Sequence, residues 1–229
     1  CAPLEANEIF DPEVLNEMGK RTLELDNTRP WHRQEPCGGS IHDYRASWEG
    51  KNPTSNMTME ADFIGEFGVD CWPNFESVKR FTPSEELIET DRYNFFINPD
   101  GVIAHHTPMF NKSDDVLRQQ KHVHLFIEPD SMKNSIIGSQ LAQVVGLRYT
   151  LERARTRWPQ CSGAIMYKLN DPYPAASWST VDWYGVPKAA HYFVSRAYAP
   201  IAAFPRLDKS EFADELNTSH KTEHLGRTD

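Results

Sequence analysis

Apolar residues recur at helical spacing in three parts of the chain. The first runs from Asp11 to Asp26, where Asp11 can cap a helix whose first position is a proline. The second, Ser135 to Trp158, predicts a long helix with arginines near its C-terminal end, where the helix dipole favours cations, and Pro159 ends it. A last helix is predicted from Pro187 to Tyr198.

Shorter apolar runs predict strands between these helices. Ala61 to Gly68 is typical of a buried strand that ends at a glycine turn, and Ser162 to Tyr167 predicts another. The segment rich in Pro, Gly, Asn and Ser that precedes them leaves room for short strands near Arg29 to Glu35 and Ser40 to Tyr44. A helix is predicted from Asn74 to Phe81.

The order of the predicted elements favours a parallel α/β fold, because parallel neighbours need helical crossovers. Residues 82–130 interrupt this order with a polar stretch, which we interpret as an insertion with weak helical patterns at Ser84–Asn94 and Asp114–Lys121. The segment from Leu207 to Asp229 is polar and charged, so the predicted folded unit covers residues 1–204 and a tail covers 205–229.

Composition excludes several classes of partner. Of the 229 residues, 39% are hydrophobic, which is enough for a core. The net charge of -9 and the absence of a basic run argue against nucleic acid. No apolar run approaches the ~20 residues that cross a bilayer, so no membrane span is predicted. The four cysteines are scattered, and free thiols are expected.

The stretch from Tyr167 to Gly185 combines aromatic, small polar and acidic residues. Pyranose rings stack on aromatic side chains through their C–H faces, and their hydroxyls bind paired donors and acceptors. This composition is typical of a sugar site.

Glycoside hydrolysis needs two carboxyl groups, one on each side of the anomeric carbon. Glu66 stands at the C-terminal end of the predicted strand before Phe67-Gly68, where barrel enzymes place catalytic groups. Glu8 follows Asn7 at the end of the first short segment. Taken alone, Glu66 also fits an edge or salt-bridged position, and the Asn7-Glu8 pair carries almost no signal.

Six segments together resemble the catalytic domain of glycoside hydrolase family 2, nearest to its exo-β-mannosidases and exo-β-glucosaminidases. They occur in the family's order between residues 7 and 200. The segments are Asn7-Glu8, Asp26-Asn27-Thr28-Arg29-Pro30, Gly38-Gly39-Ser40-Ile41-His42, Phe63-Ile64-Gly65-Glu66-Phe67-Gly68, Ser139-Gln140 and the run from Cys161 to Pro200.

The resemblance implies the C-terminal half, strands 4 to 8, of a (β/α)8 TIM barrel, formed by residues 1–204. The remaining residues 205–229 are a tail or the start of a following segment. The resemblance also implies a retaining exo-β-glycosidase for β-mannosides or related β-glycosides. In this enzyme Glu8 is the acid/base and Glu66 is the nucleophile, and their carboxyl groups are expected about 5 Å apart. Asn7 is expected at the 2-position of the sugar.

Further residues are expected around the sugar by the same resemblance. Tyr167 stands where mannosidases usually carry tryptophan, which leaves the preference for mannose open. No cofactor or metal is expected, since His105, His106, His122 and His124 lack a third ligand at zinc spacing. The other expected substrate-binding residues are Trp31, His42, Tyr44, Tyr167, Asn170, Asp171 and Trp178.

Half a barrel exposes strand edges, so the isolated chain is expected to be weakly active or inactive. We expect it to self-associate or to pair with the missing N-terminal half. Two alternatives stay open at this stage. One is a non-catalytic carbohydrate-binding or interaction module derived from such an enzyme, and the other is a small, complete α/β enzyme with unrelated chemistry.

Overall fold

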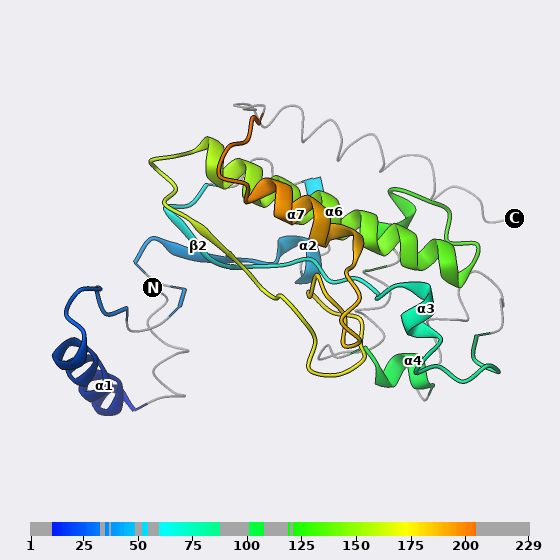
Figure 1. Cartoon of the computed structure of the whole chain (residues 1–229), viewed down its shortest axis with the longest axis horizontal. Coiled ribbons are helices and arrows are strands. Elements are labelled where there is room, and N and C mark those ends of the chain that lie inside the picture. The colour runs from blue at the N-terminus through cyan, green and yellow to red at the C-terminus, as the bar shows by residue number, and fades with distance from the viewer. Residues whose placement is uncertain are drawn as a thin grey trace, which may run out of the picture.

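The computed structural model describes residues 11–32, 35–36, 38–48, 52–54, 60–87, 101–107, 119 and 121–204. Its centre is a parallel sheet of three strands in the order β1-β2-β3: β1 (Ser40–Asp43), β2 (Phe63–Phe67) and β3 (Ala164–Met166) (Figure 1). The parallel α/β prediction is therefore confirmed for this part of the chain. The helices with fully described bounds are α1 (Pro12–Leu25), α2 (Arg45–Trp48), α3 (Phe75–Val78), α4 (Val102–His105), α6 (Met132–Thr156) and α7 (Ala189–Ala197).

The three long helices form where the sequence predicts them. The Asp11 carboxylate accepts a hydrogen bond from the Glu13 backbone N–H at 2.8 Å and so begins α1. Helix α6 begins three residues before the predicted start, because the Ser131 hydroxyl caps it by accepting from the Asn134 N–H at 3.2 Å. The shorter helix predicted from Asn74 extends only over α3.

Two predictions from the sequence differ from the structure. The strand expected at Arg29–Glu35 is absent from its described residues, because Asp26 folds the chain locally by accepting from the Thr28 N–H at 2.9 Å and from the Arg29 guanidinium at 2.6 Å. Residues 84–87 form a turn where helix was suggested, and α4 forms further along the same polar stretch.

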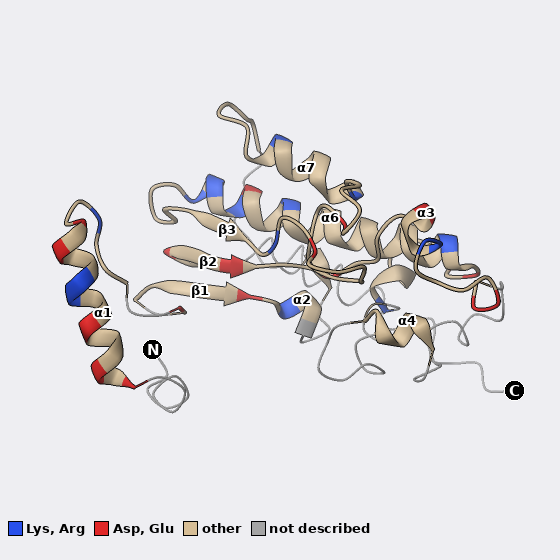
Figure 2. Cartoon of the chain, turned by 60° about the horizontal axis from the view of Figure 1, so that its bottom comes forward, with Lys and Arg blue, Asp and Glu red and all other residues tan. Residues whose placement is uncertain are grey.

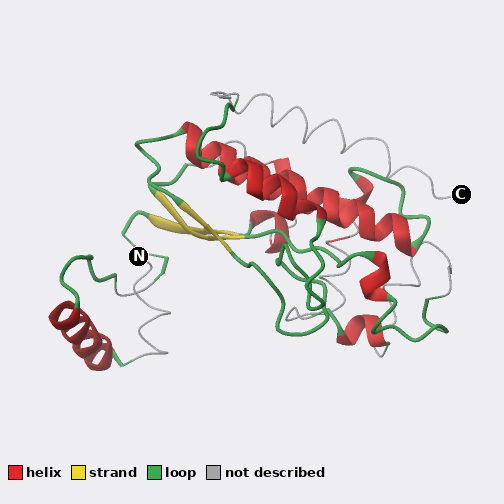
Figure 3. Ribbon diagram, viewed as in Figure 1, coloured by secondary structure: helices red, strands yellow, loops and turns green. Residues whose placement is uncertain are grey.

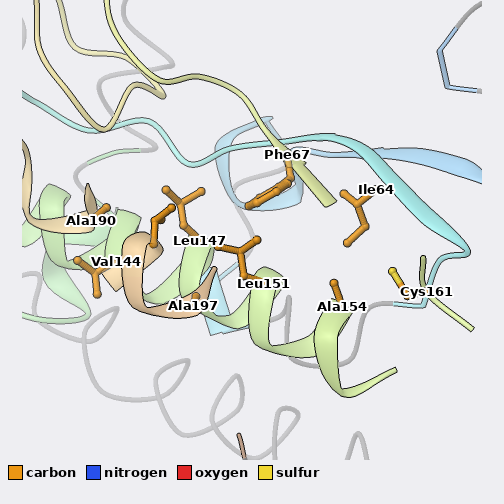
Figure 4. Packing of buried hydrophobic residues seen from close by; sticks show 10 residues of the cluster. Ile64, Phe67, Val144, Leu147, Leu151, Ala154, Cys161, Ala190 and Ala197 are labelled. Atoms are coloured by element: carbon orange, nitrogen blue, oxygen red, sulfur yellow. The ribbon is translucent and has the colours of Figure 1, made fainter. Parts of the chain in front are cut away.

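The core lies between the sheet and the helices α6 and α7, which cover one of its faces (Figure 3). Ile64 and Phe67 of β2 point from the sheet toward Leu147 and Leu151 of α6 (Figure 4). Cys161 is buried at the edge of this core as a free thiol, and Cys71 is a second buried free thiol. The free-thiol prediction is thus confirmed for these two cysteines.

Strand β2 carries one extra residue relative to both of its neighbours. Ile41 and His42 of β1 pair with Ile64 and Glu66, so Gly65 is the additional residue of a β-bulge. Ile64 and Phe67 can consequently face the same core although they are three positions apart. The bulge leaves Glu66 outside that core and opposite His42.

Gly68 lies where β2 meets the chain that leaves β3. A Cβ at this position would stand 2.6 Å from the Tyr167 carbonyl oxygen and 2.8 Å from Cδ1 of Trp178. We expect Gly68→Ala to lower the free energy of unfolding by about 1–3 kcal/mol, measured by urea unfolding, because backbone blocks the added methyl. In Gly163→Ala the obstacle is the movable Phe63 ring, at 2.8 Å, so an equal cost in the two variants would contradict this explanation.

Helix α1 stands apart from the sheet and its covering helices (Figure 1). Its surface carries one basic patch with acidic residues on both sides (Figure 2), and its apolar residues Val14 and Met18 are more than half exposed. Only Gly19 is buried, against the Trp31 ring. Among the described residues, no helix combines the length and the apolar character that a bilayer crossing requires.

Candidate active site

Three side chains meet where β1 and β2 end. His42 Nδ1 lies 3.1 Å from Glu66 Oε2, and the Tyr44 hydroxyl is hydrogen-bonded to the same carboxylate. Acidic residues mark the carboxyl ends of both strands in Figure 2. The side chains of His42 and Glu66 are each 28% exposed. The carboxylate is therefore held by neighbours while it remains open to a ligand.

Tyr44 contributes a fixed donor to this group. Burial raises the pKa of the Tyr44 phenol, and the hydrogen bond to Glu66 and the charge of that carboxylate raise this pKa further. The hydroxyl thus stays protonated over the whole neutral range. It donates to Glu66 and holds the carboxylate in one orientation.

Tyr44 also belongs to an aromatic cluster that borders Glu66. Its ring centroid lies 6.4 Å from that of Tyr167 and 5.9 Å from that of Trp178, and the last two rings are 5.7 Å apart. All three pairs meet edge to face, which is a favoured geometry for aromatic rings. The structure thus brings together five of the expected site residues: His42, Tyr44, Glu66, Tyr167 and Trp178.

The remaining expected residues are placed differently. Trp31 packs on α1 at Gly19 rather than in the aromatic cluster. Asn170 is exposed on the segment that follows β3, where it forms a bridge with Val181. Asn7 and Glu8 lie outside the described residues.

Asp171 is buried inside the loop that follows β3. Its carboxylate accepts hydrogen bonds from the hydroxyls of Ser177 and of Ser179, the latter at 2.6 Å. Lys168 Nζ lies 3.2 Å from one carboxylate oxygen, and Lys188 Nζ lies 3.9 Å from the other. These contacts are all internal to the protein, and they hold the loop together.

Lys188 lies within the run from Cys161 to Pro200, but sequence reasoning gave this lysine no role in the site. Its ammonium is fully buried and donates to the carbonyls of Cys71 and Ser177, each at 3.3 Å. A lysine placed immediately before an apolar helix is ordinarily a surface residue, so the pattern carried no signal for it. Lys188 links the start of α7 to the loop that carries Trp178.

Three histidines of the described residues, His105, His106 and His122, lie outside the site and pack against other residues of the protein. His106 lies 4.5 Å from the Phe81 ring and 5.1 Å from the His105 ring, and its Nδ1 contacts the Pro174 carbonyl oxygen at 2.5 Å. His122 is buried. Within the described ranges, no three His, Cys, Asp or Glu side chains are grouped as metal ligands.

The chain is similar in sequence to known glycosidases. The chain is 24% identical over 216 residues to β-mannosidase B of Neosartorya fischeri and 23% identical to that of Aspergillus flavus. Each alignment covers 88% of this chain but 24% of the relative, so the chain spans about a quarter of their length. No family model matches the sequence.

Solved structures share the fold. The β-D-mannosidase of Dictyoglomus thermophilum superimposes with a TM-score of 0.66 at 26% identity, over 80% of this chain and 23% of that protein. The exo-chitosanase of Amycolatopsis orientalis, solved in complex with PNP-β-D-glucosamine, superimposes with a TM-score of 0.55 at 19% sequence identity. The match covers 69% of this chain and 19% of the exo-chitosanase chain. The similarity to the exo-chitosanase shows a shared fold and nothing more.

Proposed function

Because this chain is a relative of the exo-β-mannosidases and exo-β-glucosaminidases of glycoside hydrolase family 2, we propose that it forms the C-terminal part of the catalytic barrel of a retaining exo-β-glycosidase. Terminal β-mannosides or closely related β-glycosides are the proposed substrates. The observation that carries the proposal is the setting of Glu66 at the carboxyl end of a parallel strand. Active sites of α/β barrels lie at this end.

The surroundings of Glu66 support a nucleophile. The bulge in β2 leaves Glu66 outside the core, and His42 and Tyr44 hold its carboxylate while part of it stays exposed. A carboxylate that attacks a sugar must have a fixed position and an open face. Both conditions hold at this position.

The proposed reaction has two displacements. In the first, the Glu66 carboxylate attacks the anomeric carbon while the bond to the leaving oxygen breaks and Glu8 donates its proton to that oxygen. In the second, water attacks the same carbon, Glu8 removes a proton from this water, and Glu66 leaves as a carboxylate. Two inversions give net retention, and Asn7 is proposed to bind the 2-position.

The aromatic cluster is proposed as a wall of the sugar pocket. Tyr167 is 39% exposed, and Trp178 packs against it at 5.7 Å, so the two rings offer an apolar edge beside Glu66. Sugar C–H faces bind to such surfaces. Asn170 is proposed to add an exposed amide at the rim, and Asp171 to hold the rim from within.

We also propose that the rest of the barrel covers the far side of β3. Ile165 of β3 is 57% exposed, and Trp158 beyond the end of α6 is 69% exposed. Trp158 lines a cavity of about 540 Å³ together with Leu151 and Tyr198, among other residues. Such an apolar edge is suited to a further strand and helix, from the same protein or from a second copy. Activity is therefore expected of the whole protein.

The proposal is tested with p-nitrophenyl β-glycosides of mannose, glucosamine and glucose, assayed on the whole protein that contains this chain. We expect hydrolysis of at least one of them, with the β-anomer formed first in the proton NMR spectrum. Release of the α-anomer would contradict the retaining mechanism. Binding without turnover would instead favour the carbohydrate-binding module.

The hydroxyl of Tyr44 gives a more specific prediction. Tyr44→Phe removes the donor to Glu66 and is expected to lower kcat/KM about tenfold. Because the pKa of this phenol is raised above its ordinary value, the donor is present at every pH below that ordinary value, and its contribution is lost only at higher pH. The loss should therefore be equal at mildly acidic and mildly alkaline pH in steady-state kinetics.

Tyr198→Phe is the matched control for this variant. It also deletes one phenol hydroxyl, which donates to the Ala164 carbonyl at 3.0 Å and is hydrogen-bonded to the Met166 backbone, so this hydroxyl supports β3 and not the Glu66 carboxylate. Unchanged kcat/KM is expected for the control. A tenfold loss in both variants would show that the effect of Tyr44→Phe reflects general packing.

A further inference from the structure

A single buried hydroxyl connects the segments that follow all three strands. Ser47, in the short helix after β1, donates to the Gly68 carbonyl beyond β2 at 3.2 Å. The same oxygen accepts from the Asp70 N–H at 3.3 Å and from the Trp178 indole N–H at 3.2 Å. Ser47 is 1% exposed, so these hydrogen bonds form away from bulk water.

The chemistry of serine suits this position. A hydroxyl has one donor hydrogen and two acceptor lone pairs, which matches one bond given and two received. The side chain of an alanine can neither donate nor accept a hydrogen bond. A threonine would add a methyl group to a site that is already closed on every side.

The backbone on either side of Trp178 is also fixed from within. Gln143 of α6, fully buried, directs its amide toward the carbonyls of Val69, Trp178 and Ser179 at 2.8, 3.3 and 3.1 Å. Lys188 holds the carbonyl of Ser177. These bonds fix the path of the chain, whereas the hydrogen bond that the indole N–H donates to Ser47 fixes the ring itself.

We propose that Ser47 is a positioning residue of the proposed glycosidase, which acts through the Trp178 indole and sets the aromatic wall beside Glu66. This inference rests on the proposed function. Trp178 contacts both Tyr44 and Tyr167, and Tyr44 in turn is bonded to Glu66. A rotation of the Trp178 indole therefore changes both the aromatic wall and, through Tyr44, the hydrogen bond that supports the Glu66 carboxylate. Small misplacements of this kind lower the rate of a preorganised site.

The test is a double-mutant cycle in the whole protein with Ser47→Ala and Trp178→Phe. Phenylalanine keeps an aromatic ring but has no N–H, so both single variants remove the same hydrogen bond. Each is expected to lower kcat/KM about tenfold, and the double variant about as much as the single variant with the larger loss. A loss of about a hundredfold in the double variant, the product of the two, would overturn the proposal.

Ser139→Ala provides the matched control. Ser139 is likewise 1% exposed, and its hydroxyl accepts from the Trp72 N–H at 3.2 Å and donates to the Ile136 carbonyl at 2.8 Å. We expect a comparable shift of the urea midpoint in Ser47→Ala and Ser139→Ala, but a loss of kcat/KM in Ser47→Ala alone. An equal loss of kcat/KM in the Ser47→Ala and Ser139→Ala variants would show that Ser47 contributes to packing only.

A second readout separates this inference from the proposed function. Ser47→Ala is expected to shift the tryptophan emission of the protein, and the shift should vanish in the Trp178→Phe background. This measurement needs no hydrolysis. If the emission shift is found in a protein that hydrolyses no glycoside, the proposed function fails while the contact stands. If the shift persists without Trp178, the assigned contact is wrong.

Discussion

Replacement of Glu66 by glutamine is expected to lower kcat/KM by at least about a thousandfold, because the amide keeps the shape of the side chain but cannot attack the anomeric carbon. The loss should appear in kcat, since His42 and Tyr44 remain in place to hold the position of the side chain. Steady-state kinetics with an aryl β-glycoside, together with a urea midpoint close to that of the wild type, measure this effect.

Glu60→Gln is the control for this variant. Glu60 precedes the same strand, but its carboxylate is exposed and contacts Arg157 at 3.0 Å and Arg153 at 3.5 Å, near the C-terminal end of α6. Its replacement is expected to leave kcat/KM unchanged. Activity of Glu66→Gln within tenfold of the wild type would remove Glu66 from the role of nucleophile.

The second large effect is expected in stability. Asp171→Ala should lower the free energy of unfolding by about 3–5 kcal/mol, the range for removing one partner of a buried ion pair. The Asp171 side chain is 1% exposed, and the change leaves the fully buried ammonium of Lys188 without its carboxylate. The hydroxyls of Ser177 and Ser179 lose their acceptor as well. Urea unfolding followed by tryptophan fluorescence measures the cost.

Asp182→Ala offers a comparison within the same loop. Asp182 is also buried, but its carboxylate accepts only from backbone N–H groups in the described contacts, those of Tyr184 and Val186, both at 2.9 Å. We expect a smaller cost of about 1–2 kcal/mol. An equal loss of unfolding free energy in Asp171→Ala and Asp182→Ala would show that the unpaired Lys188 ammonium does not determine the loss at Asp171.

The three long helices could be predicted from the sequence because local signals determine them, whereas the short helices α2 and α4 were not predicted. Apolar spacing, the cap at Asp11 and the proline after the second long helix suffice for α1 and α6. Even so, the apolar residues of α1 are largely exposed, since periodicity indicates a helix but not its partner. The strand predicted near Arg29 does not form in the described residues, because hydrogen bonds to the Asp26 carboxylate turn the chain there.

The candidate site residues could be named because the segments that carry them resemble the catalytic domain of a glycosidase family. The structure brings Glu66, His42 and the aromatic residues together. Ser47 carried no such signal, since its role depends on contacts with residues far along the chain. Asp171 was expected to border the sugar, but its burial with Lys188 is a tertiary feature that no local pattern indicates.

The most direct test of the central claim is covalent trapping on the whole protein. A 2-deoxy-2-fluoro glycosyl fluoride slows both displacements but keeps a good leaving group, so a retaining enzyme accumulates the glycosyl adduct. Mass spectrometry of the digested protein then identifies the labelled residue. The account predicts a single adduct on Glu66, lost in Glu66→Gln. An adduct on any other residue, or none from a protein that hydrolyses the matching glycoside, would contradict it.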